Sequence, residues 1–150
     1  MIDFSPISIP PILVFSCFKS DDYPNRVPLA YPINRFEEEI AALQKEGYSF
    51  VSIADICNYA KEARNFADNS ICVVFFGGYI DNYTIAFPIL KKYGIHADAY
   101  LANNLAGYTE YPGIPNFTPH YSWNDANAMQ ESGLVDIYSL WHPFDSGKEL

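Results

Sequence analysis

The chain has 150 residues, of which 49% are hydrophobic and 18% charged, so it lies outside the composition of disordered proteins. Nine Lys and Arg against eighteen Asp and Glu give a formal net charge of -9, the wrong sign for a protein that neutralises nucleic-acid phosphates. No window approaches the roughly 18 apolar residues that a membrane-spanning helix needs. The first residues also lack the basic region of a signal peptide. We therefore expect a soluble, single domain over residues 1–150 that binds neither nucleic acid nor membrane.

The chain has three cysteines, Cys17, Cys57 and Cys72, and no two of them have the Cys-x-x-Cys spacing. An odd, widely spaced set predicts neither a disulfide framework nor a zinc ribbon. We expect all three to be buried as small apolar side chains.

The first expected strand is the β-branched and aromatic run at residues 12–15, which is typical of a strand buried on both faces. Residues 19–33 contain three prolines and predict a long surface loop. A helix follows up to Gly47, with Asn34 and Glu37 as its expected capping box.

The same unit is expected to repeat, with a strand at residues 50–53 and a helix that runs to about residue 64. Ser52 and Asp55 have the spacing of a capping box at the start of this helix. Three side chains of the helix are expected to face inward, namely Ile56, Tyr59 and Ala60.

The third strand, at residues 71–76, is the most apolar of the chain and is followed by two glycines. A helix is expected from about residue 82 to residue 93, ending at Gly94, with Pro88 bending its axis.

The last two strands are expected at residues 97–102 and 135–140. A long loop at residues 103–121 separates the first of them from a helix at 123–132, which Ser122 and Asp125 cap. Five strands alternating with four helices favour an α/β fold with parallel pairing. Because a closed eightfold barrel normally takes at least about 200 residues, we expect an open sheet or the first part of a barrel.

Three stretches of the chain, at residues 31–53, 73–95 and 122–137, resemble the NodB-homology domain of the polysaccharide deacetylase family, also called carbohydrate esterase family 4. The second stretch contains Phe-Phe-Gly-Gly-Tyr, which is similar to the family's Phe-Asp-Asp-Gly-Tyr. The resemblance covers about residues 10–145 and implies an α/β fold of parallel strands alternating with helices, as a partial (β/α) barrel of the NodB-like type.

Family members remove acetyl groups from amino-sugar polymers with a divalent metal, usually zinc, which one Asp and two His hold beside a general-base Asp. This chain departs from the family at every one of these positions. Phe76 stands at the base position, Gly77 at the metal-binding Asp, and Leu140 and Phe144 at the two His. None of these residues can bind a cation or accept a proton. The resemblance therefore implies a pseudoenzyme for which no cofactor is expected.

The expected pocket lies at the carboxyl ends of the strands, where barrel enzymes keep their sites. Its expected residues are Phe76, Gly77, Tyr79, Asp81, Leu140, Trp141, His142 and Phe144. Asp81 is also explained by the preference for acidic residues at helix starts.

Two alternatives for this region stay open. His142 and Asp145, with Asp81 or His120, could form a shifted metal site. A set of aromatic residues is either a sugar-stacking platform or part of the packing, namely Tyr79, Tyr108, Tyr111, Tyr121 and Trp123.

Three functions follow from this sequence. The first is an inactive deacetylase-like domain that acts as a binding or interaction module for an amino-sugar polymer or oligosaccharide. The second is an active carbohydrate deacetylase that uses zinc through replacement ligands or a partner chain. The third is a structural subunit that forms a homo-oligomer by covering its open sheet edge.

Overall fold

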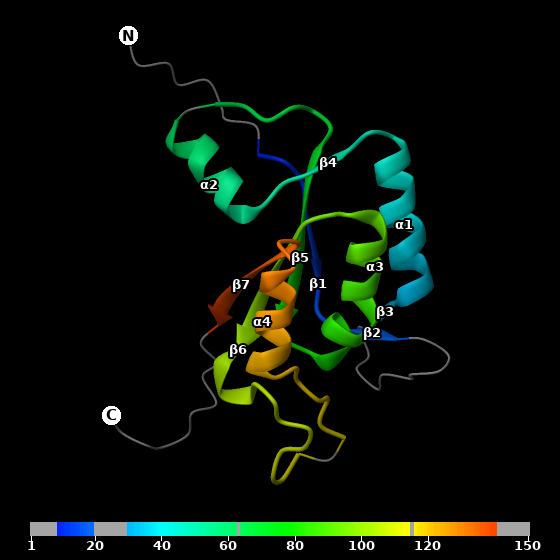
Figure 1. Cartoon of the computed structure of the whole chain (residues 1–150), viewed down its shortest axis with the longest axis vertical. Coiled ribbons are helices and arrows are strands. Elements are labelled where there is room, and N and C mark those ends of the chain that lie inside the picture. Colours follow the sequence, from blue (N-terminus) through cyan, green and yellow to red (C-terminus); the bar gives the residue numbers. More distant parts are fainter. Residues whose placement is uncertain (1–8, 20–29, 63, 115, 141–150) are drawn as a thin grey trace.

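A computed structural model describes residues 9–19, 30–62, 64–114 and 116–140 of the chain. Every pair of strands within these residues is parallel, and helices alternate with the strands, which confirms the α/β class. The main sheet has the order β1-β5-β6-β7, and the short β4 pairs with the start of β5 (Figure 1). Its strands are β1 (Ile12–Phe15), β4 (Ser49–Phe50), β5 (Ser70–Gly77), β6 (Ala97–Ala102) and β7 (Val135–Leu140).

A second, two-stranded sheet pairs β2 (Phe18–Lys19) with β3 (Tyr31–Pro32). The α-helices are α1 (Ile33–Lys45), α2 (Ile53–Lys61), α3 (Phe87–Tyr93) and α4 (Trp123–Glu131). A π-helical segment, η1 (Asn82–Ala86), leads into α3, and a 3-10 turn, η2 (Asn103–Leu105), follows β6. The strands do not close into a barrel, because β1 and β7 each pair with a single neighbour within the described residues.

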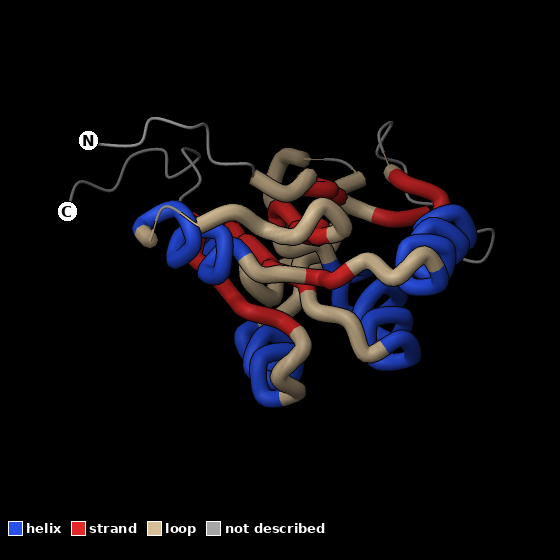
Figure 2. Tube along the Cα trace, turned by 90° about the horizontal axis from the view of Figure 1, so that it is seen from above, coloured by secondary structure: helices blue, strands red, loops and turns tan. Residues whose placement is uncertain are grey.

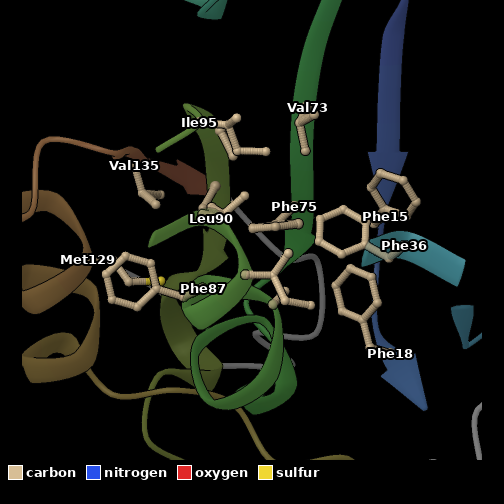
Figure 3. Close-up of a cluster of buried hydrophobic side chains, with 14 of the residues drawn as sticks. Phe15, Phe18, Phe36, Val73, Phe75, Phe87, Leu90, Ile95, Met129 and Val135 are labelled. Carbon is tan, nitrogen blue, oxygen red and sulfur yellow. The ribbon is translucent and has the colours of Figure 1, made fainter. Parts of the chain in front are cut away.

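The hydrophobic core lies between one face of the main sheet and helices α1, α3 and α4. In the view from above, the helices lie on one side of the strands and at their flanks (Figure 2). On the β1 side of the core, the ring of Phe36 lies 5.0 Å from that of Phe15 and 4.9 Å from that of Phe18 (Figure 3). All three rings are buried, and α3 and α4 extend the same cluster through Phe87 and Met129.

The opposite face of the main sheet is covered unevenly. Cys72, Val74 and Asp98 are buried there, and the start of α2 contacts Asp98, but side chains farther along the strands are exposed. Strand residues alternate between the two faces, so Phe75 points into the core with 1% of its surface exposed while Phe76 is 44% exposed. Val14 on β1 is 60% exposed, so the expectation that this strand is buried on both faces is wrong. Tyr100 and Tyr138 pair across β6 and β7 on this face, with ring centroids 5.1 Å apart. We call the part of this face around Val14, Phe76, Tyr100 and Tyr138 the open face.

The start of α1 differs from the prediction. Its N-cap is Pro32, and no side chain caps the helix, so the expected capping box of Asn34 and Glu37 is wrong. Because β3 pairs Pro32 with Lys19, this residue is held in an extended conformation directly before Ile33. The helix therefore begins before Asn34 can act as its cap.

Helix α2 keeps its predicted cap but not its predicted packing. The Ser52 hydroxyl accepts a hydrogen bond from the Asp55 amide, and the Asp55 carboxylate accepts one from the Ser52 amide, each at 3.0 Å. No residue of the helix is buried, however, so the expectation that Ile56, Tyr59 and Ala60 face the core is wrong. The helix lies apart from α1, α3 and α4, at the end where β5 begins (Figure 1).

The segment around Pro88 is a π-helix followed by an α-helix rather than one bent α-helix. Pro88 occupies the first turn of α3, directly after the π-helical segment, and it has no amide hydrogen to donate to the preceding turn. Gly94 ends α3 in the left-handed conformation, as expected. None of the helices in the described ranges is long and apolar enough to cross a membrane.

Candidate functional site

A cavity of about 560 Å³ opens at the carboxyl ends of the main sheet. Figure 1 shows the long loop between β6 and α4 at this end of the strands. Most of the cavity wall is apolar or aromatic, contributed by Phe76, Tyr79, Leu105, Tyr111, Ile114, Phe117 and Leu140. Polar groups come from Ser16, Asn116, Thr118 and His120. A concave, largely apolar site with a few polar groups is typical of ligand pockets.

The loop that forms the outer wall is fixed to the end of β5 by backbone hydrogen bonds. The Ile80 amide donates to the Pro119 carbonyl at 2.9 Å, and the Tyr121 amide donates to the Gly78 carbonyl at 3.0 Å. Tyr79 and His120 lie opposite each other between these two contacts as an antiparallel bridge. The wall is therefore an ordered part of the fold, although no helix or strand of the main sheet supplies it.

Aromatic rings continue along this wall from one side chain to the next. The His120 ring lies 4.8 Å from the Tyr79 ring and stacks on Phe117 at 5.2 Å. Phe117 in turn lies 5.8 Å from Tyr111. Burial raises the pKa of Tyr79, and the neighbouring Cys17 and Asp81 raise it further, so its phenol stays protonated at neutral pH. The wall thus presents flat ring faces and a phenol hydroxyl.

The backbone at Gly77 and Gly78 sets the floor of the cavity. Both residues have positive φ, at 109° and 86°, which side chains rarely adopt. A Cβ atom on Gly77 would lie 2.8 Å from Cε2 of Tyr79, and one on Gly78 would collide with the Leu101 side chain. An aspartate at position 77, as the family pattern has it, does not fit this backbone without rearrangement.

The metal ligands of the family are absent from this cavity as far as it is described. Gly77 and Leu140 line it and carry no donor atom, and Phe76 stands where a general base is expected. The described residues at these positions therefore do not fit a zinc ion. Trp141, His142, Phe144 and Asp145 of the expected pocket and shifted metal site lie outside the described residues.

Asp81 does not line the cavity, although we expected it there. It is fully buried, and its carboxylate accepts hydrogen bonds from the Phe18 amide at 3.0 Å and from Nδ2 of Asn82 at 3.1 Å. Asp81 stands directly before η1, at the helix start where it was expected, although its side chain makes no helix-capping hydrogen bond. Asp81 instead ties the start of η1 to β2, and within the described part of the chain it forms no metal cluster with His120.

Only some residues of the possible sugar-stacking platform line the cavity. Tyr79 and Tyr111 line the cavity, and Tyr108 lies 5.9 Å from Tyr111. Tyr121 is fully buried in the core, and burial raises its pKa strongly, so it is a packing residue. Trp123 begins α4 and is absent from the cavity wall.

Phe117 is a wall residue that was not predicted from the sequence. It lies in a proline-rich loop with no periodic pattern, so its position depends on the backbone contacts of that loop. The only signal in the sequence was the unusual density of aromatic residues between 108 and 123.

The cysteines are not all buried as expected. Cys17 and Cys72 are buried, but Cys57 is exposed because it lies on α2, which packs no residue into the core. The burial raises the pKa of Cys17 to about 11 and that of Cys72 to about 12, with smaller contributions from nearby carboxylates.

The sequence matches no family model. Two curated relatives are nevertheless named polysaccharide deacetylases. YxkH of Bacillus subtilis is 26% identical over 101 residues, which is 67% of this chain and 34% of the relative. The poly-beta-1,6-N-acetyl-D-glucosamine N-deacetylase of Staphylococcus epidermidis is 29% identical over 114 residues, or 76% of this chain and 38% of the relative. The chain thus spans little more than a third of their length.

Solved structures share the fold. IcaB from Ammonifex degensii superposes with a TM-score of 0.72 at 21% identity, over 86% of this chain and 51% of that one. A de-N-acetylase from Aggregatibacter actinomycetemcomitans gives a TM-score of 0.71 at 22% identity, over 86% of this chain and 53% of the other. The fold is therefore that of the NodB-like deacetylases. With the curated relatives, it supports a polysaccharide deacetylase-like domain, and the resemblance seen in the sequence is confirmed.

Proposed function

We propose that this domain binds an amino-sugar polymer in the cavity at the carboxyl ends of its strands and does not hydrolyse it. The observation that carries the proposal is that apolar residues replace the catalytic and metal-binding residues of the family at this site. Rings and aliphatic side chains line the cavity where the family has a base and metal ligands, with Phe76, Gly77 and Leu140 at the exchanged positions. Such a wall favours the flat apolar faces of sugar rings over a hydrated cation.

The substrate class is supported by the relatives. One of them is named for poly-beta-1,6-N-acetyl-D-glucosamine, and this chain resembles it over 76% of its own length. The cavity also has the polar groups that sugar hydroxyls and acetamides need, from Asn116, Thr118 and His120. An N-acetylglucosamine oligomer is therefore the ligand that we would test first.

The absence of hydrolysis is supported by the backbone as well as by the side chains. Amide hydrolysis by the family's chemistry needs a metal to polarise the carbonyl and a base to accept a proton from water. Restoring the acidic pair at positions 76 and 77 would require the chain to leave the positive φ at Gly77 and to move Tyr79. More than one substitution therefore separates this site from a catalytic one.

Binding is tested by titrating the protein with β-1,6-linked N-acetylglucosamine oligomers, and with chitin and peptidoglycan fragments, by calorimetry. We expect saturable binding of at least one of these ligands. Replacing Phe117 with alanine removes one ring of the wall. Since a stacked ring contributes about 1 kcal/mol, Phe117→Ala should weaken binding about fivefold.

The matched control is Phe66→Ala. Phe66 is also partly buried, and its ring stacks on that of Tyr59 at 4.2 Å, but it lies outside the cavity. This variant should bind the oligomer as the unmodified protein does. Failure of every oligomer to bind, or equal losses in the two variants, would contradict the proposed sugar site.

We infer a second candidate function, self-association, from the edge of the main sheet. Ile12 and Val14 on β1 are 42% and 60% exposed, and β1 pairs only with β5 among the described strands. An exposed apolar edge strand is a template for pairing with another chain, so a second copy could cover it. Sedimentation velocity should then show a dimer at high micromolar concentration that Val14→Lys abolishes. A species that remains monomeric over the whole range would refute this function.

A further inference from the structure

Three side chains of types that can bind metal ions meet at the amino ends of β6 and β7, at the opposite end of the sheet from the cavity. His96 directly precedes β6, Asp98 is its second residue, and Asp136 is the second residue of β7. Asp98 and Asp136 are paired across the two strands, so their side chains leave the same face of the sheet. His96 lies two residues before Asp98 and therefore shares this face.

The donor atoms of these side chains are close enough to share one ion. Nε2 of His96 lies 3.9 Å from Oδ1 of Asp98 and 3.7 Å from Oδ2 of Asp136. All three donor atoms lie within 4.8 Å of one another. Two ligands of a tetrahedral zinc ion, at bond lengths of about 2.1 Å, are about 3.4 Å apart. Movements of a few tenths of an ångström would bring His96 to that spacing from each carboxylate. The two carboxylate oxygens, which lie up to 4.8 Å apart, would have to approach each other by about 1.4 Å.

A buried oxygen without a hydrogen-bond partner points to a ligand at this place. Asp98 is completely buried, and neither its Oδ1 nor the buried Nε2 of His96 has a partner within ordinary hydrogen-bond distance, although His96 and Tyr138 lie near enough to act on this carboxylate. Leaving a buried carboxylate oxygen and an imidazole nitrogen unsatisfied is costly, whereas a cation between them would satisfy both.

The other oxygen of Asp98 is already held. Oδ2 accepts a hydrogen bond from the Ile53 amide at 3.0 Å and from the Cys72 thiol at 3.5 Å. These contacts from α2 and β5 fix the carboxylate so that Oδ1 faces His96. Outer partners that orient a ligand in this way are typical of protein metal sites.

We propose that His96, Asp98 and Asp136 bind a divalent transition-metal ion such as Zn²⁺. One imidazole and two carboxylates suit this class, because imidazole disfavours Mg²⁺ and Ca²⁺, which take oxygen ligands. The two carboxylates carry two negative charges, and Asp55 also lies near enough to act electrostatically on His96. Asp136 is 48% exposed at its side chain, so an ion can enter from solvent. Three protein ligands leave a fourth position open.

The proposal is tested on the full chain after treatment with a chelator, by calorimetric titration with Zn²⁺. We expect one zinc per chain, not displaced by a large excess of Mg²⁺. His96→Gln and Asp136→Asn each remove one ligand without changing the core, and each should lower the zinc affinity at least tenfold. Circular dichroism verifies that both variants are folded. Asp68→Asn, which neutralises an exposed acid outside the cluster, should leave the affinity unchanged.

Two results would overturn the proposal. One is a folded protein that takes up no zinc, in which case a protonated His96 simply pairs with the two carboxylates. The other is zinc binding that neither His96→Gln nor Asp136→Asn weakens, which would place the ion elsewhere. Because this cluster and the cavity lie at opposite ends of the strands, either variant should leave oligomer binding intact, so this proposal and the sugar site can fail independently.

Discussion

Phe75 and Phe76 are neighbours in the sequence on opposite faces of β5, and their truncation tests which face is covered. Phe75 is 1% exposed and lies 5.8 Å from the Phe18 ring and 6.1 Å from the Phe36 ring. Phe75→Ala removes a completely buried ring and leaves a cavity, which costs about 3–5 kcal/mol. Phe76 is 44% exposed, so Phe76→Ala loses only about half of the burial energy of a phenylalanine, or about 1–1.5 kcal/mol, and leaves no closed cavity.

The measurement is urea unfolding followed by circular dichroism, at a protein concentration where sedimentation detects only monomer. The free energies of unfolding of the two variants should differ by about 1.5 kcal/mol or more, which at an m-value of about 2 kcal/mol/M separates the midpoints by at least about 0.75 M. Phe75→Leu, with an expected loss of about 1 kcal/mol, provides a folded variant if the alanine form is too unstable. Equal losses, or a greater loss at Phe76, would refute the open face.

Two further predictions concern the thiols and a helix cap. In the native protein at pH 8, a thiol reagent should modify Cys57 alone, because burial shields Cys17 and Cys72 and raises the pKa of both; rapid modification of a second thiol would contradict their burial. Hydrogen bonds from the amide and hydroxyl of Ser52 lower the pKa of Asp55 from its ordinary value of 3.8. The Asp55 carboxylate therefore contributes fully to the free energy of unfolding above pH 3.8, and this contribution is lost as the pH falls through the lower folded-state pKa. Asp55→Asn should thus cost about 0.5–1 kcal/mol at pH 7 and almost nothing well below the folded-state pKa in urea unfolding, and a pH-independent cost would contradict the assigned role.

Much of the fold could be predicted because its signals are local. A continuous apolar run identifies β1, and the spacing of Ser122 to Asp125 identifies the start of α4, where both hydrogen bonds of the capping box form. Each pattern depends on a few consecutive residues. Strands that alternate with helices then leave little choice of topology.

The errors arose where distant contacts decide the structure. The start of α1 depends on the pairing of Pro32 with Lys19, and the burial of Asp81 depends on the Phe18 amide, 63 residues away. The exposure of Cys57 follows from the position of α2 beyond the core, although the helix itself was predicted. Local patterns contain none of this information.

The candidate site was partly predictable for the same reason. Phe76, Gly77, Tyr79 and Leu140 follow from strand ends, and the structure brings these residues together in one cavity. The wall that faces them comes from an aperiodic loop, so Phe117 could not be identified in advance. The cluster of His96 with two carboxylates was not predicted either, because it forms only when the register of β6 against β7 places Asp98 beside Asp136.

The central proposal, binding without hydrolysis, is tested most directly by measuring acetate release from N-acetylglucosamine oligomers in the presence of Zn²⁺. The measurement is made at oligomer concentrations that calorimetry shows to saturate the protein. We predict acetate release no faster than in a protein-free control. Acetate release that requires the folded protein and stops when the metal is chelated would contradict the proposal.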